Sequence, residues 1–106
     1  MHGNNENTVL LIKELPDQLE ATGIQLRKSG YRVLTAIDGW KGLEVAKREH
    51  PDLIVSDVVM QQMDGIQLCH LIRRHCQLYT IPVLLLSTSS KDVSDAARIM
   101  AIFRML

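Results

Sequence analysis

The chain has 106 residues, of which 46% are hydrophobic and 23% are charged, and its 12 basic and 12 acidic side chains give a formal net charge of zero. This length suits one domain that needs no disulfides, and the charge balance argues against nucleic acid as its direct partner. No apolar run is long enough to span a membrane and no apolar leader follows Met1, which indicates a cytoplasmic protein.

Apolar runs of strand length alternate with segments of helical periodicity along the chain. Strands are predicted at residues 8–12, 31–36, 53–55 and 83–86, and helices at 16–29, 39–49 and 64–76. Strands that alternate with helices at this spacing predict βαβ units with right-handed crossovers. The expected fold is therefore α/β, a flavodoxin-like doubly wound parallel sheet with strand order 2-1-3-4.

Local signals support these boundaries. Residues 1–7 are polar and lack periodicity, which predicts a flexible leader ahead of a domain over residues 8–106. Pro16 suits the first turn of a helix, and Gly30 suits its carboxyl cap. The next helix must end before Pro51, because the residue that precedes a proline disfavours helical geometry.

The stretch from Pro51 to Gly65 combines a buried strand with an acidic residue. Its apolar run is followed by Asp57, and the carboxyl end of such a strand faces the crevice where open α/β sheets place their chemistry. From the strand alone, Asp57 as a turn former or helix cap and Asp57 as a functional group are equally good interpretations. Asp64 stands where it can cap the next helix, which leaves Asp57 available for function.

This stretch resembles the receiver domain of two-component response regulators. The family has an Asp that ends the third strand, a Met three residues later and Met-Asp-Gly at the start of the third helix, which here are Asp57, Met60 and residues 63–65. Gln61 stands where the family usually has proline, and the resemblance extends over about residues 8–100. It implies that Asp57 accepts a phosphoryl group from a histidine kinase with the help of Mg²⁺.

The resemblance also implies the ligands of that Mg²⁺ ion. Receivers use two acidic residues after the first strand, the phosphoacceptor carboxylate and a backbone carbonyl two residues beyond it. Here these positions are Lys13, Glu14, Asp57 and the carbonyl of Val59. The chain would at most assist its own Mg²⁺-dependent phosphorylation and dephosphorylation, and is otherwise not expected to be an enzyme.

The resemblance assigns a role to a hydroxyl after the fourth strand as well. In receivers, the Ser or Thr at the position of Ser87 hydrogen-bonds the phosphoryl oxygen and moves when phosphate arrives. Thr88 follows where a small residue usually stands. From the residues alone, hydroxyls at a strand end are ordinary turn or cap groups.

Lys13 is the main departure from the family pattern. A fixed cation at a normally acidic position should oppose Mg²⁺, although Glu14 would allow weak binding to survive. Two interpretations of its side chain remain open. It could form an ion pair that lowers the pKa of Asp57, or it could extend into solvent on its long stem.

The second departure is at the carboxyl-terminal end. After a helical pattern at residues 91–100, no strand ending in Lys-Pro follows, so the fifth βα unit of a receiver is missing and the domain is expected to be truncated. An open flank of the fourth strand would favour a homodimer or a swapped assembly. Residues 101–106 are expected to help cover that flank.

Two functions follow from these expectations. In the first, the chain is a phosphoacceptor receiver of a response regulator or hybrid kinase, with a histidine kinase or phosphotransfer protein upstream and an output domain downstream. In the second, it is a degenerate receiver that binds partners without phosphorylation. Asp57, Glu14 and Ser87 favour the first function, whereas Lys13 and the missing lysine favour the second. A hydrolase is disfavoured, because no nucleophile elbow or glycine-rich phosphate loop is found.

Overall fold

The computed structural model describes residues 7–86 and the backbone of residues 102–103. They form a five-stranded sheet with the order β2-β1-β3-β4-β5, in which the first four strands are parallel. The elements are β1 (Thr8–Ile12), α1 (Pro16–Lys28), β2 (Arg32–Ala36), α2 (Gly39–Glu49), β3 (Leu53–Asp57), α3 (Gly65–Arg74), β4 (Val83–Leu86) and β5 (Ile102–Phe103). The predicted α/β fold and the strand order 2-1-3-4 are confirmed.

Helix caps explain several of these boundaries. The Asp38 carboxylate accepts a hydrogen bond from the Lys41 amide at the start of α2, and the Asp64 carboxylate accepts one from the Gln67 amide at the start of α3, both at 2.8 Å. α2 ends at Glu49, and the cap residue His50 adopts a left-handed conformation with φ 48°. Asp64 is thus the helix cap that the sequence predicts, and Asp57 does not have this role.

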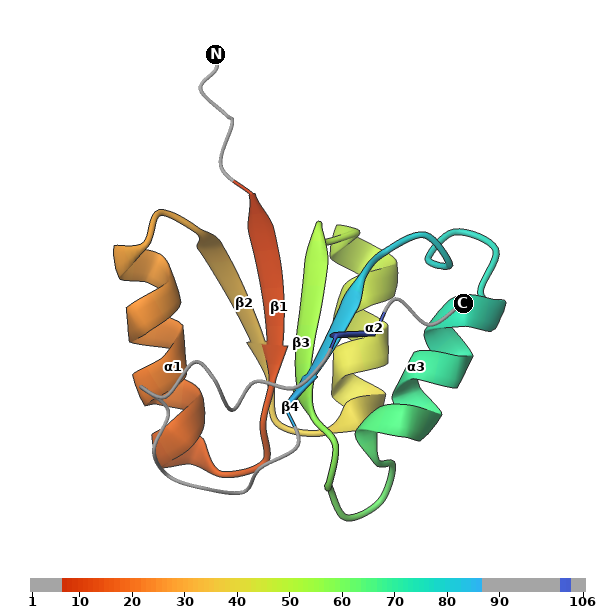
Figure 1. The fold of residues 1–106 in the computed structure, drawn as a ribbon, viewed down its shortest axis with the longest axis horizontal. Coiled ribbons are helices and arrows are strands. Elements are labelled where there is room, and N and C mark those ends of the chain that lie inside the picture. Colours follow the sequence, from red (N-terminus) through yellow and green to blue (C-terminus); the bar gives the residue numbers. More distant parts are fainter. Residues whose placement is uncertain (1–6, 87–101, 104–106) are drawn as a thin grey trace.

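The sheet is covered on both faces, as a parallel sheet requires. Figure 1 shows α1 on one side of the strands and α2 with α3 on the other. Along β1, Leu10 and Ile12 pack in the cluster that includes α2 and α3, while Val9 and Leu11 pack in the cluster that α1 covers. No helix in the described part of the chain is long and apolar enough to cross a membrane.

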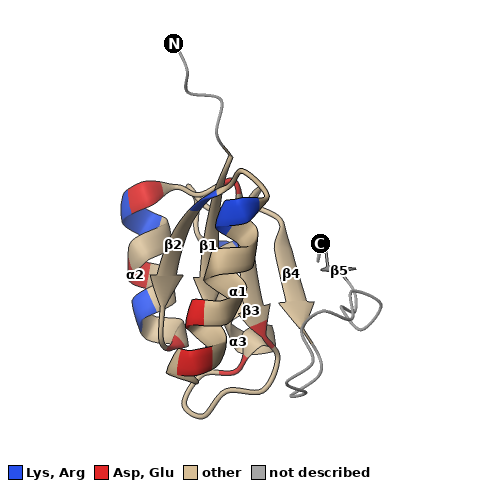
Figure 2. Cartoon of the chain, turned by 90° about the vertical axis from the view of Figure 1, so that its left-hand side faces the viewer, with Lys and Arg blue, Asp and Glu red and all other residues tan. Residues whose placement is uncertain are grey.

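α1 carries charges that suit its helix dipole. Asp17 lies in its first turn, and Arg27 and Lys28 lie in its last, which Figure 2 shows as red and blue bands toward opposite ends of the helix. Acidic groups stabilise the amino end of a helix and basic groups its carboxyl end. The amino end of α1 follows directly from β1, so it lies at the same edge of the sheet as Asp57.

The outer edge of β4 is partly covered by β5. Val83 pairs with Phe103 and Leu84 with Ile102 in an antiparallel arrangement, and Figure 2 shows β5 beside β4. The position of the usual fifth parallel strand is therefore taken by a two-residue antiparallel strand. This pairing agrees with the expectation that residues 101–106 help to cover this flank. The predicted helix over 91–100 lies outside the described residues.

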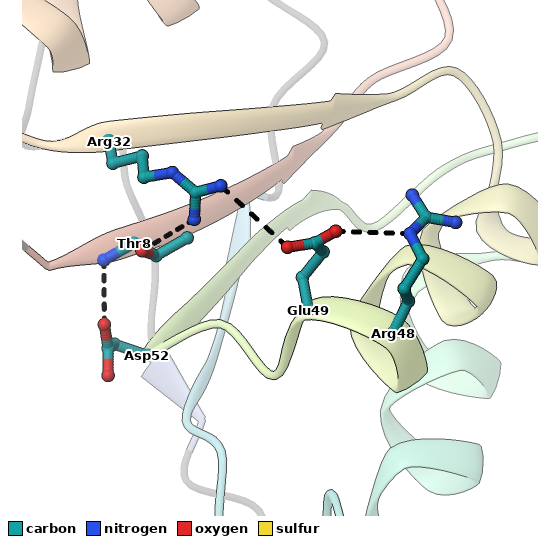
Figure 3. Close-up of polar contacts among 5 residues, drawn as sticks. All are labelled: Thr8, Arg32, Arg48, Glu49 and Asp52. Carbon is teal, nitrogen blue, oxygen red and sulfur yellow. Dashed lines mark hydrogen bonds and ion pairs between the residues drawn. The ribbon is translucent and has the colours of Figure 1, made fainter.

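A polar network joins the elements at the opposite, amino-terminal end of the strands (Figure 3). The Thr8 amide donates to the Asp52 carboxylate at 2.8 Å, and the Arg32 guanidinium donates to the Thr8 hydroxyl at 3.4 Å. Arg32 and Arg48 both pair with Glu49, at 3.9 and 3.2 Å. These five residues come from β1, β2, the last turn of α2 and the loop before β3, and they lie at the opposite end of the strands from Asp57.

Candidate functional site

Asp57 is the last residue of β3 and lies at the carboxyl edge of the sheet. Its backbone is fixed from two directions: the hydroxyl of the buried Ser56 donates to the Asp57 carbonyl at 2.9 Å, and the Val58 amide donates to the Leu86 carbonyl, also at 2.9 Å. The Asp57 side chain is 19% exposed. The carboxylate is thus held in place while remaining accessible from the surface.

Lys13 extends from the end of β1 directly to this carboxylate. Its ammonium nitrogen Nζ donates to Asp57 Oδ1 at 2.8 Å, and its side chain is only 7% exposed. The Lys13 amide also donates to the Ala36 carbonyl at 3.2 Å, which ties this residue to the end of β2. Of the two open interpretations, the ion pair is the one present, and the alternative in which Lys13 extends into solvent is wrong.

The pKa of Asp57 lies above its usual value, although the Lys13 ammonium is beside it. Burial raises this pKa above its usual 3.8 and is the largest effect. The hydrogen bond and the charge of Lys13 each lower it by less, and the nearby charge of Glu14 raises it further. The ion pair with Lys13 thus lowers the pKa of Asp57, as the first interpretation holds, but the loss of hydration at the end of a packed strand and the charge of Glu14 leave the net shift upward.

Glu14, the acid that the sequence retains beside Lys13, has a main-chain donor. Its Oε2 accepts a hydrogen bond from the Gln61 amide at 2.7 Å. Gln61 is the position where the family usually has proline, and proline has no amide hydrogen to donate. The sequence shows this replacement, but its consequence for Glu14 emerges only from the structure.

The loop between β3 and α3 is packed tightly against the end of the strand. Met60 and Met63 are buried and anchor it, and the Gly65 amide donates to the Val58 carbonyl at 2.7 Å. A Cβ atom at Gly65 would collide with the backbone carbonyl oxygen of Asp57. Only glycine fits here, so the first residue of α3 rests directly on the backbone of Asp57.

The other predicted site residues are placed as follows. Val59 lies in the loop after β3 and is 76% exposed, and its carbonyl follows Asp57 by two residues. Ser87 and Thr88 lie outside the described residues, so their roles remain predictions. In the sheet, Asp57 is the register partner of Leu86, and Ser87 is the next residue in the chain.

A family model described as "Response regulator receiver domain" matches residues 9–103. The chain belongs to this family. The receiver domain is 37% identical over 86 residues to the transcriptional regulatory protein AfsQ1 of Streptomyces coelicolor, in a match that covers 81% of this chain and 37% of AfsQ1. It is 42% identical over 67 residues to the alkaline phosphatase synthesis transcriptional regulatory protein PhoP of Bacillus subtilis, covering 63% of this chain and 27% of PhoP. The chain thus spans about a third of these relatives or less.

Solved structures of receiver domains have the same fold. The chemotaxis response regulator CheY4 of Vibrio cholerae superposes with a TM-score of 0.75 at 28% identity, covering 87% of this receiver domain and 77% of that chain. The signal receiver domain of a histidine kinase from Syntrophus aciditrophicus gives a TM-score of 0.73 at 35% identity, covering 87% and 69%. The flavodoxin-like arrangement and the place of the chain in two-component signalling are confirmed.

The side chains around Asp57 do not fit the Mg²⁺ ion that receiver domains generally bind. Mg²⁺ requires hard oxygen ligands in an octahedral arrangement. Here one oxygen of Asp57 accepts from the Lys13 ammonium and one oxygen of Glu14 accepts from the Gln61 amide. Within residues 7–86, no group of three or more Asp, Glu, His or Cys side chains is arranged to hold a metal ion. A buried cation stands where a third acidic ligand would be.

Proposed function

We propose that this receiver domain accepts a phosphoryl group on Asp57 from a histidine kinase or a phosphotransfer protein, and that the change is passed to an output domain. The observation that supports this most strongly is the position of the Asp57 carboxylate. It is fixed at the carboxyl end of β3, it remains 19% exposed, and it has an ammonium group 2.8 Å away. Positioning and electrostatic stabilisation are the main requirements of phosphoryl transfer.

The proposed step forms one bond and breaks another. An oxygen of Asp57 bonds to phosphorus while the bond between phosphorus and the imidazole nitrogen of the donor phosphohistidine breaks. The electron pair of the broken bond stays on the imidazole, which takes up a proton. Negative oxygens come together in this step, and Lys13 places a positive charge beside them.

A second candidate function is a degenerate receiver that binds its partners without phosphorylation. The ion pair between Lys13 and Asp57 favours it as well, since the pair already satisfies the carboxylate in the unmodified protein. The two candidates differ in one measurable property, the attachment of phosphate to Asp57.

Intact-mass spectrometry after incubation with a small-molecule phosphodonor separates the two candidates. We expect the wild-type chain to gain one phosphoryl group and Asp57→Asn to gain none. Asp64→Asn is the matched control, because asparagine also caps helices well and Asp64 has only a capping role in the structure. Modification of Asp57→Asn, or no modification of the wild-type chain by any donor, would rule out the phosphoacceptor function in favour of the interaction module.

The proposal also covers assembly and location. β5 pairs with Val83 and Leu84 only, so within the described residues the outer edge of Leu85 and Leu86 has no strand partner. An open edge of this kind favours a homodimer or a swapped assembly, which light scattering over a range of concentrations would detect. We place the receiver domain in the cytoplasm, with the output domain in a longer protein or a separate partner.

A further inference from the structure

We propose that Lys13 is a built-in cation that replaces the divalent ion, and that the Asp57 pocket therefore excludes Mg²⁺. We define this pocket by Lys13, Glu14, Asp57 and the backbone of Gln61. The inference concerns the two positions at which the sequence departs from the receiver pattern around Asp57. In the structure, each departure supplies a hydrogen-bond donor to one of the two carboxylates.

The first donor is the ammonium group of Lys13. It lies 2.8 Å from Asp57 Oδ1, and its side chain is 7% exposed, so it is committed to this contact rather than to water. A divalent ion at Asp57 would have to displace the ammonium or approach it closely. Displacing the ammonium would break its ion pair with Asp57. Approaching it closely would bring two cations together, and like charges repel strongly where water is excluded. Lys13 also removes one of the carboxylates that a receiver uses to attract the metal.

The second donor is the backbone amide of Gln61. It donates to Glu14 Oε2 at 2.7 Å and so occupies an oxygen of the other carboxylate. A chain with proline at this position would have no such donor. The two replacements therefore act together: Lys13 neutralises Asp57, and Gln61 holds Glu14. Reversing only one of them should restore metal binding only in part.

The consequence for phosphorylation rests on the function proposed above. If Asp57 accepts a phosphoryl group, the positive charge beside the incoming oxygens comes from the Lys13 side chain, which is part of the chain itself and not a dissolved ion. The transfer should then proceed equally well with and without a divalent ion. A receiver domain of this kind would respond to its kinase independently of the Mg²⁺ concentration.

A metal titration tests the pocket without any phosphate chemistry. Mn²⁺, a paramagnetic probe, is added to ¹⁵N-labelled protein, and the broadening of the amide signals of residues 57–61 is followed. We expect no saturable broadening in the wild-type chain and saturable broadening in Lys13→Asp. Lys13→Met, which removes the cation without adding a ligand, should bind more weakly than Lys13→Asp. Saturable binding of Mn²⁺ by the wild-type pocket would overturn the proposal whether or not the variants fold.

A pair of substitutions at Gln61 tests the second donor. In the Lys13→Asp background, Gln61→Pro removes the amide hydrogen that holds Glu14, whereas Gln61→Ala keeps it. We expect Mn²⁺ to bind about tenfold more tightly to the proline variant than to the alanine variant, the size typical of changes beside metal ligands. Equal affinities in the two variants would show that the Gln61 amide has no part in excluding the metal.

Phosphorylation with EDTA and with Mg²⁺ completes the test, with intact mass as the readout. We expect equal modification of the wild-type chain in both buffers, and Mg²⁺-dependent modification of Lys13→Asp. If the wild-type chain is modified only with Mg²⁺, the phosphoacceptor function stands and this inference fails. If it is modified in neither buffer, the phosphoacceptor function fails, and the Mn²⁺ titration alone decides whether the pocket excludes metal.

Discussion

The two ends of the parallel strands carry ion pairs in very different environments. At the carboxyl end, Lys13 and Asp57 meet at 2.8 Å with side chains that are 7% and 19% exposed. At the amino end, Arg32 and Glu49 are 3.9 Å apart with side chains that are 50% and 32% exposed (Figure 3). The same sheet thus presents one pair that is largely shielded from water and one pair that is open to it.

The two ion pairs differ in how strongly the stability of the folded protein depends on both partners being present. An exposed pair contributes about 0–1 kcal/mol to the free energy of unfolding, because water solvates the separate charges well and salt screens their attraction. In a buried pair, the attraction must offset the lost hydration of both groups, so removing one partner leaves the other uncompensated. The raised pKa of Asp57 shows that burial, together with the charge of Glu14, outweighs the attraction of Lys13. Burying the charges at the carboxyl end of the strands therefore costs free energy, which is typical of a functional site.

The largest expected effect comes from breaking the buried pair. Asp57→Ala leaves the ammonium of Lys13 enclosed without a partner, and we expect a loss of about 3 kcal/mol in the free energy of unfolding, measured by urea denaturation. Replacing both residues, as in Lys13→Met with Asp57→Leu, should recover most of this loss, because no buried charge remains. A loss for Asp57→Ala no larger than that for Arg32→Ala would contradict the contrast between the two ends.

The pH dependence of stability should also distinguish Asp57. Because the pKa of Asp57 is raised in the folded state, the native protein binds the proton of the Asp57 carboxyl group more tightly than the unfolded chain does. The destabilisation from the buried charge is complete above the folded-state pKa and disappears as the pH falls toward the usual value of 3.8. The wild-type chain should therefore gain stability relative to Asp57→Asn on acidification through this range. We expect this gain to be smaller than the loss caused by Asp57→Ala. Urea denaturation of both proteins at a series of pH values measures this difference, and a relative loss of stability would contradict the direction of the shift.

At the amino end of the strands, by contrast, a substitution should make the protein more stable. His50 ends α2 with φ 48°, a conformation that costs a side chain free energy and that glycine adopts readily. We expect His50→Gly to stabilise the protein by up to about 1 kcal/mol, seen as a higher midpoint of thermal unfolding. His50→Ala is the control, because alanine keeps the Cβ atom and should bring no gain. Equal effects of the two substitutions would show that the backbone conformation is not the cause.

The smallest expected effect comes from the exposed network. Arg32→Ala should cost about 0.2–1 kcal/mol at low ionic strength, and the loss should shrink at 1 M salt, where the screening length falls to about 3 Å. The loss from Asp57→Ala should change much less with salt, since that pair is shielded. Urea denaturation at the two salt concentrations gives all four values, and equal salt sensitivity of the two variants would remove the distinction.

Much of the fold could be predicted from the sequence because the relevant signals are local. The apolar run at residues 83–86 matches β4, and Asp64 caps α3 as its position suggests. α3 ends at Arg74, two residues earlier than predicted, because His75 already adopts an extended conformation. β5 was not predicted, since a two-residue strand has no periodicity to detect.

The chemistry of the pocket was harder to predict because it depends on the folded backbone. The positions of Asp57, Lys13 and Glu14 follow from the motif, but the direction of the pKa shift follows from burial. The bond between Glu14 and Gln61 joins residues 47 positions apart. It requires the conformation of the loop after β3, which no local pattern specifies. The sequence shows Gln61 in place of the usual proline, but it does not show which acceptor the Gln61 amide meets.

The contact at Gly65 couples the strand mechanically to the helix. With no side chain between Gly65 and the Asp57 carbonyl, nothing compressible separates the end of β3 from the first turn of α3. Any displacement of the Asp57 backbone must therefore push or release that turn. α3 has ten residues and rises about 15 Å, so a small tilt at Gly65 becomes a larger displacement at Arg74. The direction of α3 is therefore set where its first residue meets the backbone of Asp57.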